Sequence, residues 1–362
     1  MKKDDDNGKP DNGLGTVTIR DIARELGISH ATVSLAMRDH ARISDRTIER
    51  VKQKAEEMGY NPDPTLSALS HYRKVSKDTM KSTVLAWINP GREAKIHDDL
   101  NEFRLYREGA EASVKRMGFE LEEFALENMD LDSLLAELRE RQIQGIVVAP
   151  VTSQSANVDW ESFPWHEFSS IRFGRNEIGP PIKYVASAQV SNTILMFKKA
   201  QAKGYRRIGY IGYRLGRMMY VSGYMGCQVE LSDENRVPPM LLEYGSLGVS
   251  ADRLKRWMKQ YRPDAILTPC GELPEMLSAL GYSIPEDVAL ATTSIHDTPI
   301  DAGIDQNPEE IGAAAIRSLV AEINEQRFGI PAVSCSILID GSWVEGSMLP
   351  DCSQGAIRTG DA

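Results

Sequence analysis

Apolar residues recur at helical spacing in three short runs near the start of the chain. The members of these runs are Ile19, Ile22, Ala23 and Leu26, then Val33, Ala36 and Met37, then Ile48, Val51, Ala55 and Met58. A capping residue precedes each run, because Thr18, Ser29 and Ser44 can each accept a hydrogen bond from a free backbone N–H. Gly27 and Gly59 can end the first and third helices, since glycine adopts a left-handed conformation without steric cost. The pattern predicts three short helices, of which the first two have helix-turn-helix spacing.

The outward positions of the second predicted helix are small or polar enough for close approach to a DNA duplex. They are Ala31, Thr32, Ser34, Leu35 and Arg38. His30 stands at the start of this helix and brings a ring nitrogen that can reach a base edge. A purely structural three-helix module stays open on this pattern, because apolar helix–glycine–helix units also occur in enzymes.

Two prolines interrupt the chain after the third helix. Pro62 forbids its continuation, while Pro64 suits the first position of a new short helix after Asp63. A helix of one or two turns is marginal alone in water, so we expect this one to fold against a surface. Residues 62–81 are therefore predicted to form a hinge helix and linker.

The motifs VTIRDIARELGIS, ATVS and MGYNP resemble the lactose/galactose-repressor family of bacterial transcription regulators. The resemblance implies a hinge helix that folds when a dimer meets its operator, with Leu69 at the position of a leucine that wedges into the minor groove. An apolar wedge kinks DNA by unstacking a base step. The alternative for Leu69 is an ordinary contact between two subunits. Where the family commonly has an arginine after TVS, this chain has Leu35, which can pack on a thymine methyl but cannot donate a hydrogen bond to guanine.

Composition and charge fit a DNA-binding head on a large core. The chain has 362 residues, of which 41% are hydrophobic, so it can bury such a core. Its net charge is −10, but Thr16 to Lys77 carries 11 Lys/Arg against 8 Asp/Glu, a net charge of +3. A modestly basic head on an acidic body is expected of a protein that grips phosphates at one end only. The residues expected to meet phosphates are Thr18, Ser34, Arg38 and Thr47.

Strand and helix patterns alternate after residue 82. Strands are predicted at 83–88, 120–124, 145–150, 207–212, 264–268 and 288–292, and helices at 106–117, 131–142, 194–203, 254–260 and 274–280. This βαβ rhythm predicts parallel sheets covered by helices, in two lobes. AKGYRRIGYIG, RPDAILT, GYSIPEDVALA and NPEEIGAAAIRSL resemble the family's effector core, which is similar to periplasmic sugar-binding proteins. The resemblance implies a ligand cleft between the lobes and three crossings of the chain, expected near Val185, Thr293 and Gly329.

The predicted fold class is therefore α/β, with an all-α head before the core. The expected parts are a disordered tail at 1–15, a helix-turn-helix DNA-binding domain at 16–61, the hinge helix and linker at 62–81, a two-lobed doubly wound parallel-sheet core for effector binding and dimerisation at 82–350, and a C-terminal tail at 351–362.

The family's usual sugar-gripping residues are mostly absent from this core. Ser187 ends the segment where an aspartate usually follows the first crossing, Tyr220 stands where an arginine usually precedes a Gly-aromatic pair, and Cys270-Gly271 replaces an Asn-Asp pair. Sugar hydroxyls need charged and amide partners, so the sequence does not identify the effector. The candidates to line the cleft, each with ordinary packing or surface exposure as the alternative, are Phe103, Trp160, Ser187, Tyr220, Asp305 and Gln306.

Other protein classes lack their signatures in this sequence. It has no nucleophile elbow, phosphate-cradling glycine loop or zinc-ligand spacing, so neither an enzyme, a cofactor nor a metal site is predicted. His296-Asp297 is interpreted as a pair of neighbours in a loop. The four cysteines include no C-x-x-C pair, which favours reduced thiols in a cytoplasm. No apolar run approaches the roughly 18 residues of a membrane span.

We therefore predict a cytoplasmic, homodimeric, sequence-specific DNA-binding transcription regulator. More specifically, we expect a repressor of a palindromic double-stranded operator with a small-molecule-responsive core. The alternatives are an architectural DNA-binding protein and a regulator without a small-molecule effector. The residues predicted to contact DNA are Thr18, Ser29, His30, Ala31, Thr32, Ser34, Leu35, Arg38, Thr47 and Leu69.

Overall fold

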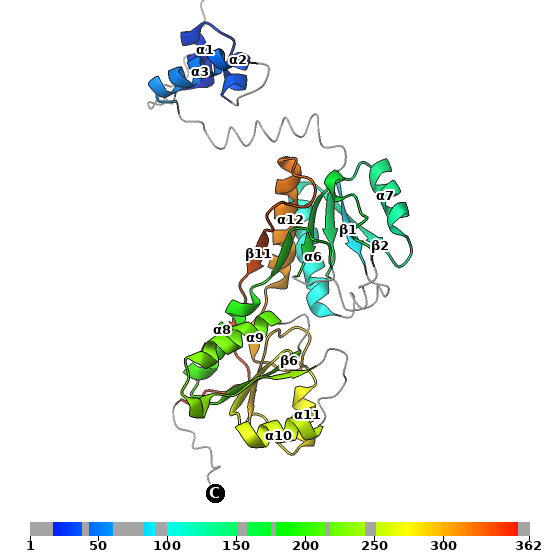
Figure 1. The fold of residues 1–362 in the computed structure, drawn as a ribbon, viewed down its shortest axis with the longest axis vertical. Helices are drawn as coiled ribbons and strands as arrows, with labels where there is room; N and C mark the ends of the chain where they lie inside the picture. The colour runs from blue at the N-terminus through cyan, green and yellow to red at the C-terminus, as the bar shows by residue number, and fades with distance from the viewer. Residues whose placement is uncertain are drawn as a thin grey trace, which may run out of the picture. The chain divides into compact units, whose positions relative to one another are not determined.

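The computed structural model describes residues 17–37, 43–60, 83–90, 100–150, 158–174, 179–213, 218–242 and 251–353. The chain divides into two compact units, Met1–Met80 and Lys81–Ala362, which we call the head and the core. Both are drawn in Figure 1. The predicted hinge helix with its Leu69, and Arg38, lie outside the described residues.

The three predicted helices of the head are confirmed as α1 (Ile19–Leu26), α2 (His30–Ala36) and α3 (Asp45–Glu57). Thr18 and Asp21 form a capping box at the start of α1, in which each side chain accepts a hydrogen bond from the backbone N–H of the other. Gly27 ends α1 in the left-handed region, with φ 65°. Ser29 caps α2 as predicted, because its Oγ accepts from the N–H of Thr32 at 3.0 Å. Ser44 precedes α3 but makes no side-chain cap to its backbone.

One small apolar core holds these helices together. Its buried members are Ile22, Ala23, Val33, Ala36, Val51 and Ala55, and the half-buried side chains around them are Val17, Ile19, Leu26, Ile28, Met37, Ile43, Ile48, Met58 and Tyr60. The helical spacing of the apolar residues therefore fixes which face of each helix turns inward.

The N-terminal lobe of the core is built on a six-stranded sheet with the order β11-β5-β4-β3-β1-β2. Its neighbouring strands are parallel, and their bounds are β1 (Val84–Asn89), β2 (Glu120–Ala125), β3 (Gly145–Val148), β4 (Ser169–Phe173), β5 (Tyr184–Ser187) and β11 (Ser336–Ile339). Helices α6 (Asn101–Met117) and α12 (Pro308–Asn324) pack side by side, while α7 (Leu131–Glu140) packs into an apolar cluster that also holds the short helix η2 (Trp165–Glu167) (Figure 1).

Two glycines allow α6 and α12 to pack backbone against backbone. A Cβ placed on Gly109 would lie 2.0 Å from the carbonyl oxygen of Glu309, and one on Gly312 would lie 1.9 Å from that of Tyr106. Any side chain at either position would force the helices apart, so this contact fixes the position of α6 in its lobe.

The C-terminal lobe has a second six-stranded sheet, with the order β12-β10-β9-β8-β6-β7. Its strands are β6 (Ile208–Tyr213), β7 (Met240–Leu242), β8 (Ala265–Thr268), β9 (Ala289–Thr292), β10 (Gly303–Asp305) and β12 (Ser342–Val344), and the β10–β12 pair is antiparallel. The helices in the described residues of this lobe are α8 (Gln189–Ala202), α9 (Met218–Val229), the short η3 (Asp233–Asn235), α10 (Ala251–Tyr261) and α11 (Leu273–Ala279).

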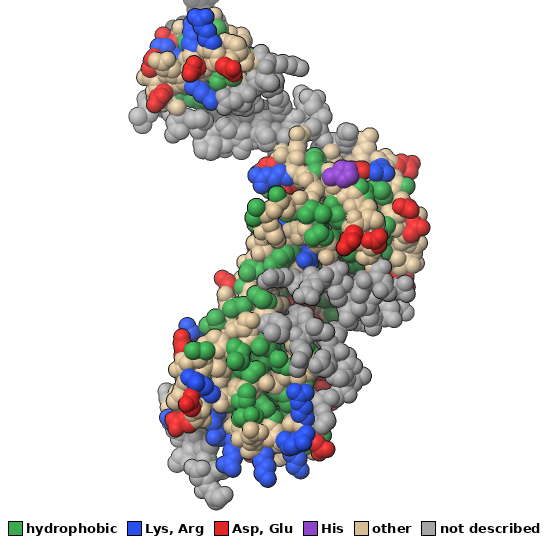
Figure 2. Space-filling view, in the orientation of Figure 1, with side chains coloured by type: hydrophobic (Ala, Val, Ile, Leu, Met, Phe, Trp, Pro, Cys, Tyr) green, Lys and Arg blue, Asp and Glu red, His purple; other side chains and the backbone are tan. Residues whose placement is uncertain are grey.

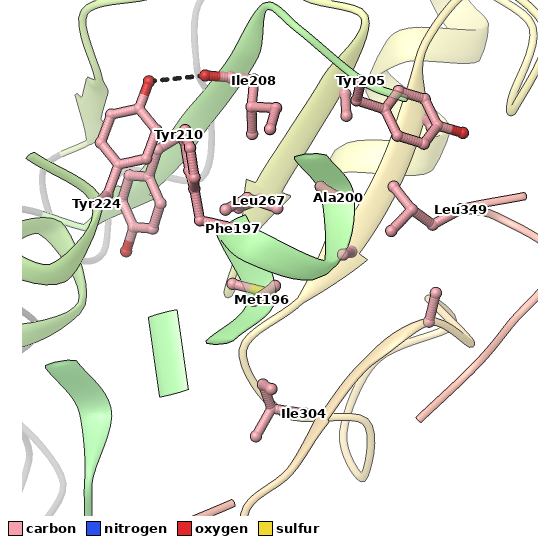
Figure 3. Packing of buried hydrophobic residues seen from close by; sticks show 14 of the residues in the cluster. Met196, Phe197, Ala200, Tyr205, Ile208, Tyr210, Tyr224, Leu267, Ile304 and Leu349 are labelled. Atoms are coloured by element: carbon pink, nitrogen blue, oxygen red, sulfur yellow. Dashed lines mark hydrogen bonds between the residues drawn. The ribbon is translucent and has the colours of Figure 1, made fainter. Parts of the chain in front are cut away.

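The two faces of this second sheet bury separate apolar clusters. One cluster joins the sheet to α8 and α9, through side chains such as Phe197, Tyr210 and Tyr224, and Figure 3 shows the Tyr224 hydroxyl donating a hydrogen bond to the carbonyl of Ile208. The other joins it to α10 and α11, through side chains such as Leu254, Trp257 and Leu277. The doubly wound arrangement is thus confirmed in this lobe.

The chain crosses between the lobes three times. The first crossing joins β5 to α8 at Ala188, close to the prediction near Val185. The other two predictions are wrong: the second crossing lies between β10 and α12, around Asn307, and the third between β11 and β12. The reason is that β10 and β11, of three and four residues, are too short to give a clear pattern, so each crossing was expected one strand early.

Candidate functional site

Helix α2 is held by its inward residues and presents the others outward. Val33 and Ala36 are fully buried, His30 is exposed, and Thr32, Ser34 and Leu35 are half-buried. Leu35 does not belong to the described side chains that pack on the head's apolar core. This arrangement supports the outward reading of Leu35 over a core position.

A side-chain hydroxyl makes a hydrogen bond at the start of each of the three head helices. The Thr18 hydroxyl donates to the carboxylate of Asp21 at 2.6 Å, and this hydrogen bond holds the pKa of Asp21 below its ordinary value. The hydroxyls of Ser29 and Thr32 lie 2.8 Å apart, and those of Ser44 and Thr47 lie 2.9 Å apart. A phosphate contact by Thr18 would therefore share its hydroxyl with a charged carboxylate, which weakens that candidate relative to Thr47.

Of the remaining DNA candidates, Ala31 lies on α2, but its side chain is outside what the structure describes, as are Arg38 and Leu69. Ser29 is exposed at the α2 cap. Their contacts with DNA stay predictions.

In the core, a loop of the C-terminal lobe reaches the start of α6 in the N-terminal lobe. The carboxylate of Asp297 accepts hydrogen bonds from the backbone N–H groups of Asn101 at 2.8 Å and Glu102 at 3.1 Å. Ser294 Oγ also donates to the Glu102 carboxylate at 3.3 Å, and the Asn101 side-chain amide donates to the carbonyl of His296 at 3.3 Å. The loop follows the carboxyl end of β9 and α6 follows the segment after β1, so the contact joins the strand ends at which this fold binds ligands.

Two predicted effector residues, Phe103 and Asp305, lie next to these interlobe hydrogen bonds. Phe103 is on the first turn of α6 and stacks on Tyr106, with ring centroids 6.0 Å apart. Asp305 Oδ1 is 3.0 Å from His296 Nε2, beside Asp297. Phe103 therefore follows the two α6 residues that contact this loop, and Asp305 pairs with a residue of the loop, although about two hundred residues separate the two candidates.

Tyr220 and Gln306 form a buried polar pair inside the C-terminal lobe. Gln306 Nε2 donates to the Tyr220 hydroxyl at 2.8 Å and to the carbonyl of Thr293 at 2.9 Å, and only 2% of Tyr220 and 3% of Gln306 is exposed. These groups satisfy one another, so they support the loop that begins at Thr293.

Ser187 and Trp160 lie among contacts that hold the fold together. The Asn192 side-chain amide donates to Ser187 Oγ at 2.8 Å, and Asn192 Oδ1 accepts from the N–H of Gly341, so Asn192 ties Ser187 at the first crossing to the third crossing. Trp160 lies in the aromatic cluster under α7, where its carbonyl accepts from the Trp165 indole N–H at 3.0 Å. The structure brings neither together with the loop of Asp297.

Sequence reasoning missed Asn101, Glu102 and Asp297. The pair His296-Asp297 was correctly placed in a loop but given no partner. The available signal was the start of α6, which was predicted at Tyr106 and lies at Asn101, where the preceding Leu100 offers no capping side chain. A helix start without a cap points to a partner elsewhere in the chain.

Charge is unevenly spread over the core surface. Figure 2 shows Lys and Arg side chains gathered over α10, whose exposed cations include Arg253, Lys255, Arg256 and Lys259. The same helix buries Leu254, Trp257 and Met258, so its basic face is the solvated side of an amphipathic helix.

Within the described ranges, no three His, Cys, Asp or Glu residues gather as a metal site would require. The helices in those ranges are all too short or too polar to cross a membrane.

Comparison with known proteins gives two family matches. The model of the bacterial regulatory proteins of the lacI family matches residues 18–63, and that of the periplasmic binding protein-like domain matches residues 198–343. No curated protein sequence matches the chain significantly.

Solved structures extend the likeness over nearly the whole chain. A lac repressor dimer bound to operator and the anti-inducer ONPF is 15% identical, with a TM-score of 0.53, over 93% of this chain and 100% of that one. A transcriptional regulator CelR–cellobiose complex is 16% identical, with a TM-score of 0.52, over 92% and 99%. A putative ribose operon repressor from Burkholderia thailandensis is 18% identical, with a TM-score of 0.51, over 73% and 99%. At these identities the likeness shows the fold.

Proposed function

We propose that the chain is a member of the LacI family of bacterial regulatory proteins, and that it represses transcription as a cytoplasmic homodimer on an inverted-repeat operator. The observation that carries the proposal is the head. Val33 and Ala36 hold α2 against the other two helices, while His30 and Leu35 are left on its outward side. A helix fixed in this way can enter the major groove and read base edges.

The dimeric state is proposed from the similar lac repressor, which is a dimer bound to its operator. A two-fold symmetric dimer reads two equivalent half-sites, so the operator should be an inverted repeat. The family is regulatory, and we propose that this chain has no enzymatic activity.

For the core, we propose a small-molecule effector bound where the two lobes meet, near Phe103 and Asp305. The similar CelR structure contains cellobiose, which supports a ligand in this fold. Phe103 offers a half-buried ring on the N-terminal lobe and Asp305 a carboxylate on the C-terminal lobe. A ligand that contacts both would favour one arrangement of the lobes over others.

A gel-shift series with DNA selected by the full chain tests DNA binding. Affinity should fall steeply with salt, because phosphate contacts release counterions. Arg38→Gln should weaken binding and lower the slope of log affinity against log salt by about 1. Lys259→Gln, on the basic face of α10, is the matched control and should leave the slope unchanged. Equal effects of the two substitutions, or salt-independent affinity, would contradict the head as the DNA-binding unit.

A regulator without an effector is the second candidate, and one observation favours it: the chain supplies its own interlobe hydrogen bonds through Asp297. A metabolite screen by melting temperature separates the two candidates, since a ligand that binds only the folded state raises that temperature. A compound that shifts the wild type but not Phe103→Ala supports the effector. A broad screen with no shift supports the second candidate.

A further inference from the structure

The start of α6 depends on the opposite lobe. Leu100, the residue before the helix, makes no side-chain cap, so it leaves the first N–H groups of α6 to other partners. Asp297 supplies both of its carboxylate oxygens to them, at 2.8 and 3.1 Å. A carboxylate at a helix N-terminus is also stabilised by the helix dipole and by the charge on the acceptor.

The loop that carries Asp297 is itself fixed within the C-terminal lobe. Thr292 Oγ1 donates to the carbonyl of Ser294 at 2.9 Å, the N–H of Ile295 donates to the carbonyl of Ile304 at 3.1 Å, and His296 pairs with Asp305. The Asp297 carboxylate is thus presented by a braced loop and keeps its position relative to the C-terminal-lobe sheet.

A second contact lies beside the first. The Glu102 carboxylate accepts from Ser294 Oγ with one oxygen and from the Tyr106 hydroxyl, at 2.7 Å, with the other. Tyr106 in turn stacks on Phe173 of β4, with ring centroids 5.2 Å apart. The interlobe contact therefore continues into the packed interior of the N-terminal lobe, and α6 itself is fixed there by its backbone contact with α12.

We propose that Asp297 is a latch that holds the two lobes together in the ligand-free chain. The three crossings connect the lobes covalently, while the latch adds a breakable bridge at the strand ends, between α6 and the loop after β9. An effector at this place either keeps the latch, and then stabilises the resting arrangement, or displaces it, and then opens the lobes. The action of an effector on the latch rests on the proposed function, whereas the latch itself does not.

Hydrogen–deuterium exchange on the ligand-free full chain tests the latch. In Asp297→Ala, the segment that begins α6 should exchange roughly tenfold faster, the expected loss for a charge-assisted hydrogen bond, and small-angle scattering should give a larger radius of gyration. Asp297→Asn keeps the side-chain size and one acceptor oxygen, so its exchange rate at the start of α6 should lie between those of the wild type and Asp297→Ala. Because this substitution leaves no cavity, it serves as the second variant in case Asp297→Ala fails to fold.

Asp301→Ala is the matched control. The Asp301 carboxylate also accepts two backbone hydrogen bonds, from Ser347 at 2.7 Å and Met348 at 3.0 Å, but all three residues belong to one lobe. In this variant, amide exchange at 347–348 should be faster, while exchange at α6 and the radius of gyration should match those of the wild type. Wild-type exchange at α6 in both Asp297 variants, or equal changes there in Asp301→Ala, would overturn the latch. These measurements use neither operator nor effector, so their outcome does not depend on the proposed function.

Discussion

The head and the core build their candidate sites from contacts of very different sequence separation. In the head, the capping box joins Thr18 to Asp21, and the α2 cap joins Ser29 to Thr32, each over three residues. In the core, Asn101 and Asp297 are 196 residues apart. Local contacts leave a pattern in the sequence, whereas a contact across a folded core leaves none, so the two sites differ in how they can be found and how they can be broken.

The largest expected effect is a loss of stability in the head that leaves the core intact. Ile22→Ala removes a fully buried side chain from the head core and should cost about 2–5 kcal/mol of the head's stability. That is a large share for so small a domain, so DNA binding should be lost while the core melts at the wild-type temperature. Calorimetry and gel shift measure this. Arg24→Ala, exposed on the same helix, is the control and should change neither. A core transition that moves with Ile22→Ala would show that the two units do not fold independently.

The next effect is confined to the core. Gly312→Ala places a methyl group where 1.9 Å separates it from the Tyr106 carbonyl, and should cost about 1–3 kcal/mol through displacement of α6 from α12. Gly226→Ala on α9 is the matched control, since nothing lies within 4 Å of the added Cβ and alanine favours a helix. Chemical denaturation should give a lower free energy of unfolding for Gly312→Ala than for the wild type, and no such loss for Gly226→Ala. Equal stability of Gly312→Ala and the wild type would contradict the direct backbone contact.

The fold was predictable to the extent that its elements were long and periodic. Helices α1, α2 and α3 and the buried strands β1, β3 and β8 were all expected within a few residues of their bounds. Strands β4, β5, β7, β10, β11 and β12, of three to five residues each, were missed because so short a run has no readable alternation. Helices α9 and α12 were missed for another reason. The α9 sequence MMYVSGYMGCQV is apolar on most sides and α12 is buried on most sides, so no single apolar face marks either as helical.

The candidate sites also differ in how far their residues could be predicted from the sequence. Outward residues of α2 could be assigned from helical phase alone, and the structure agrees for His30 and Leu35. In the core, Phe103 and Asp305 were singled out without any basis for placing them near one interlobe contact, and Trp160, chosen with them, lies instead in the apolar cluster of α7. Only folding brings the residues after β9 to the start of α6, so Asp297 could not have been recognised from its neighbours in sequence.

A base-reading substitution sharpens the assignment within the head. Leu35→Arg should shift preference toward guanine at one operator position by about 1–3 kcal/mol, because arginine can donate two hydrogen bonds to guanine and leucine none. Leu35 is half-buried and outside the head core, so the head should stay folded. Site selection with both proteins measures the shift. Identical motifs at undiminished head stability would show that position 35 does not touch DNA.

The smallest expected effect concerns the capping box. The hydrogen bond from the Thr18 hydroxyl holds the pKa of Asp21 below its ordinary value of 3.8. A carboxyl group whose pKa is lower in the folded than in the unfolded state stabilises the fold at pH values above its unfolded-state pKa. That stabilisation is lost as the pH falls through the folded-state pKa. Asp21→Asn should therefore lower the head's melting temperature slightly at neutral pH, and the difference should vanish in acid. A difference that is constant from neutral pH to strong acid would mean that the ionised carboxylate has no part in the cap.

The most direct test of the central claim, that the head makes this chain a sequence-specific DNA-binding regulator, is selection of bound duplexes from a random pool by the full-length protein. We expect enrichment of one inverted repeat, with the same repeat absent when Ile22→Ala replaces the wild type. No enrichment by the wild type, or the same enriched sequence with the head unfolded, would contradict it.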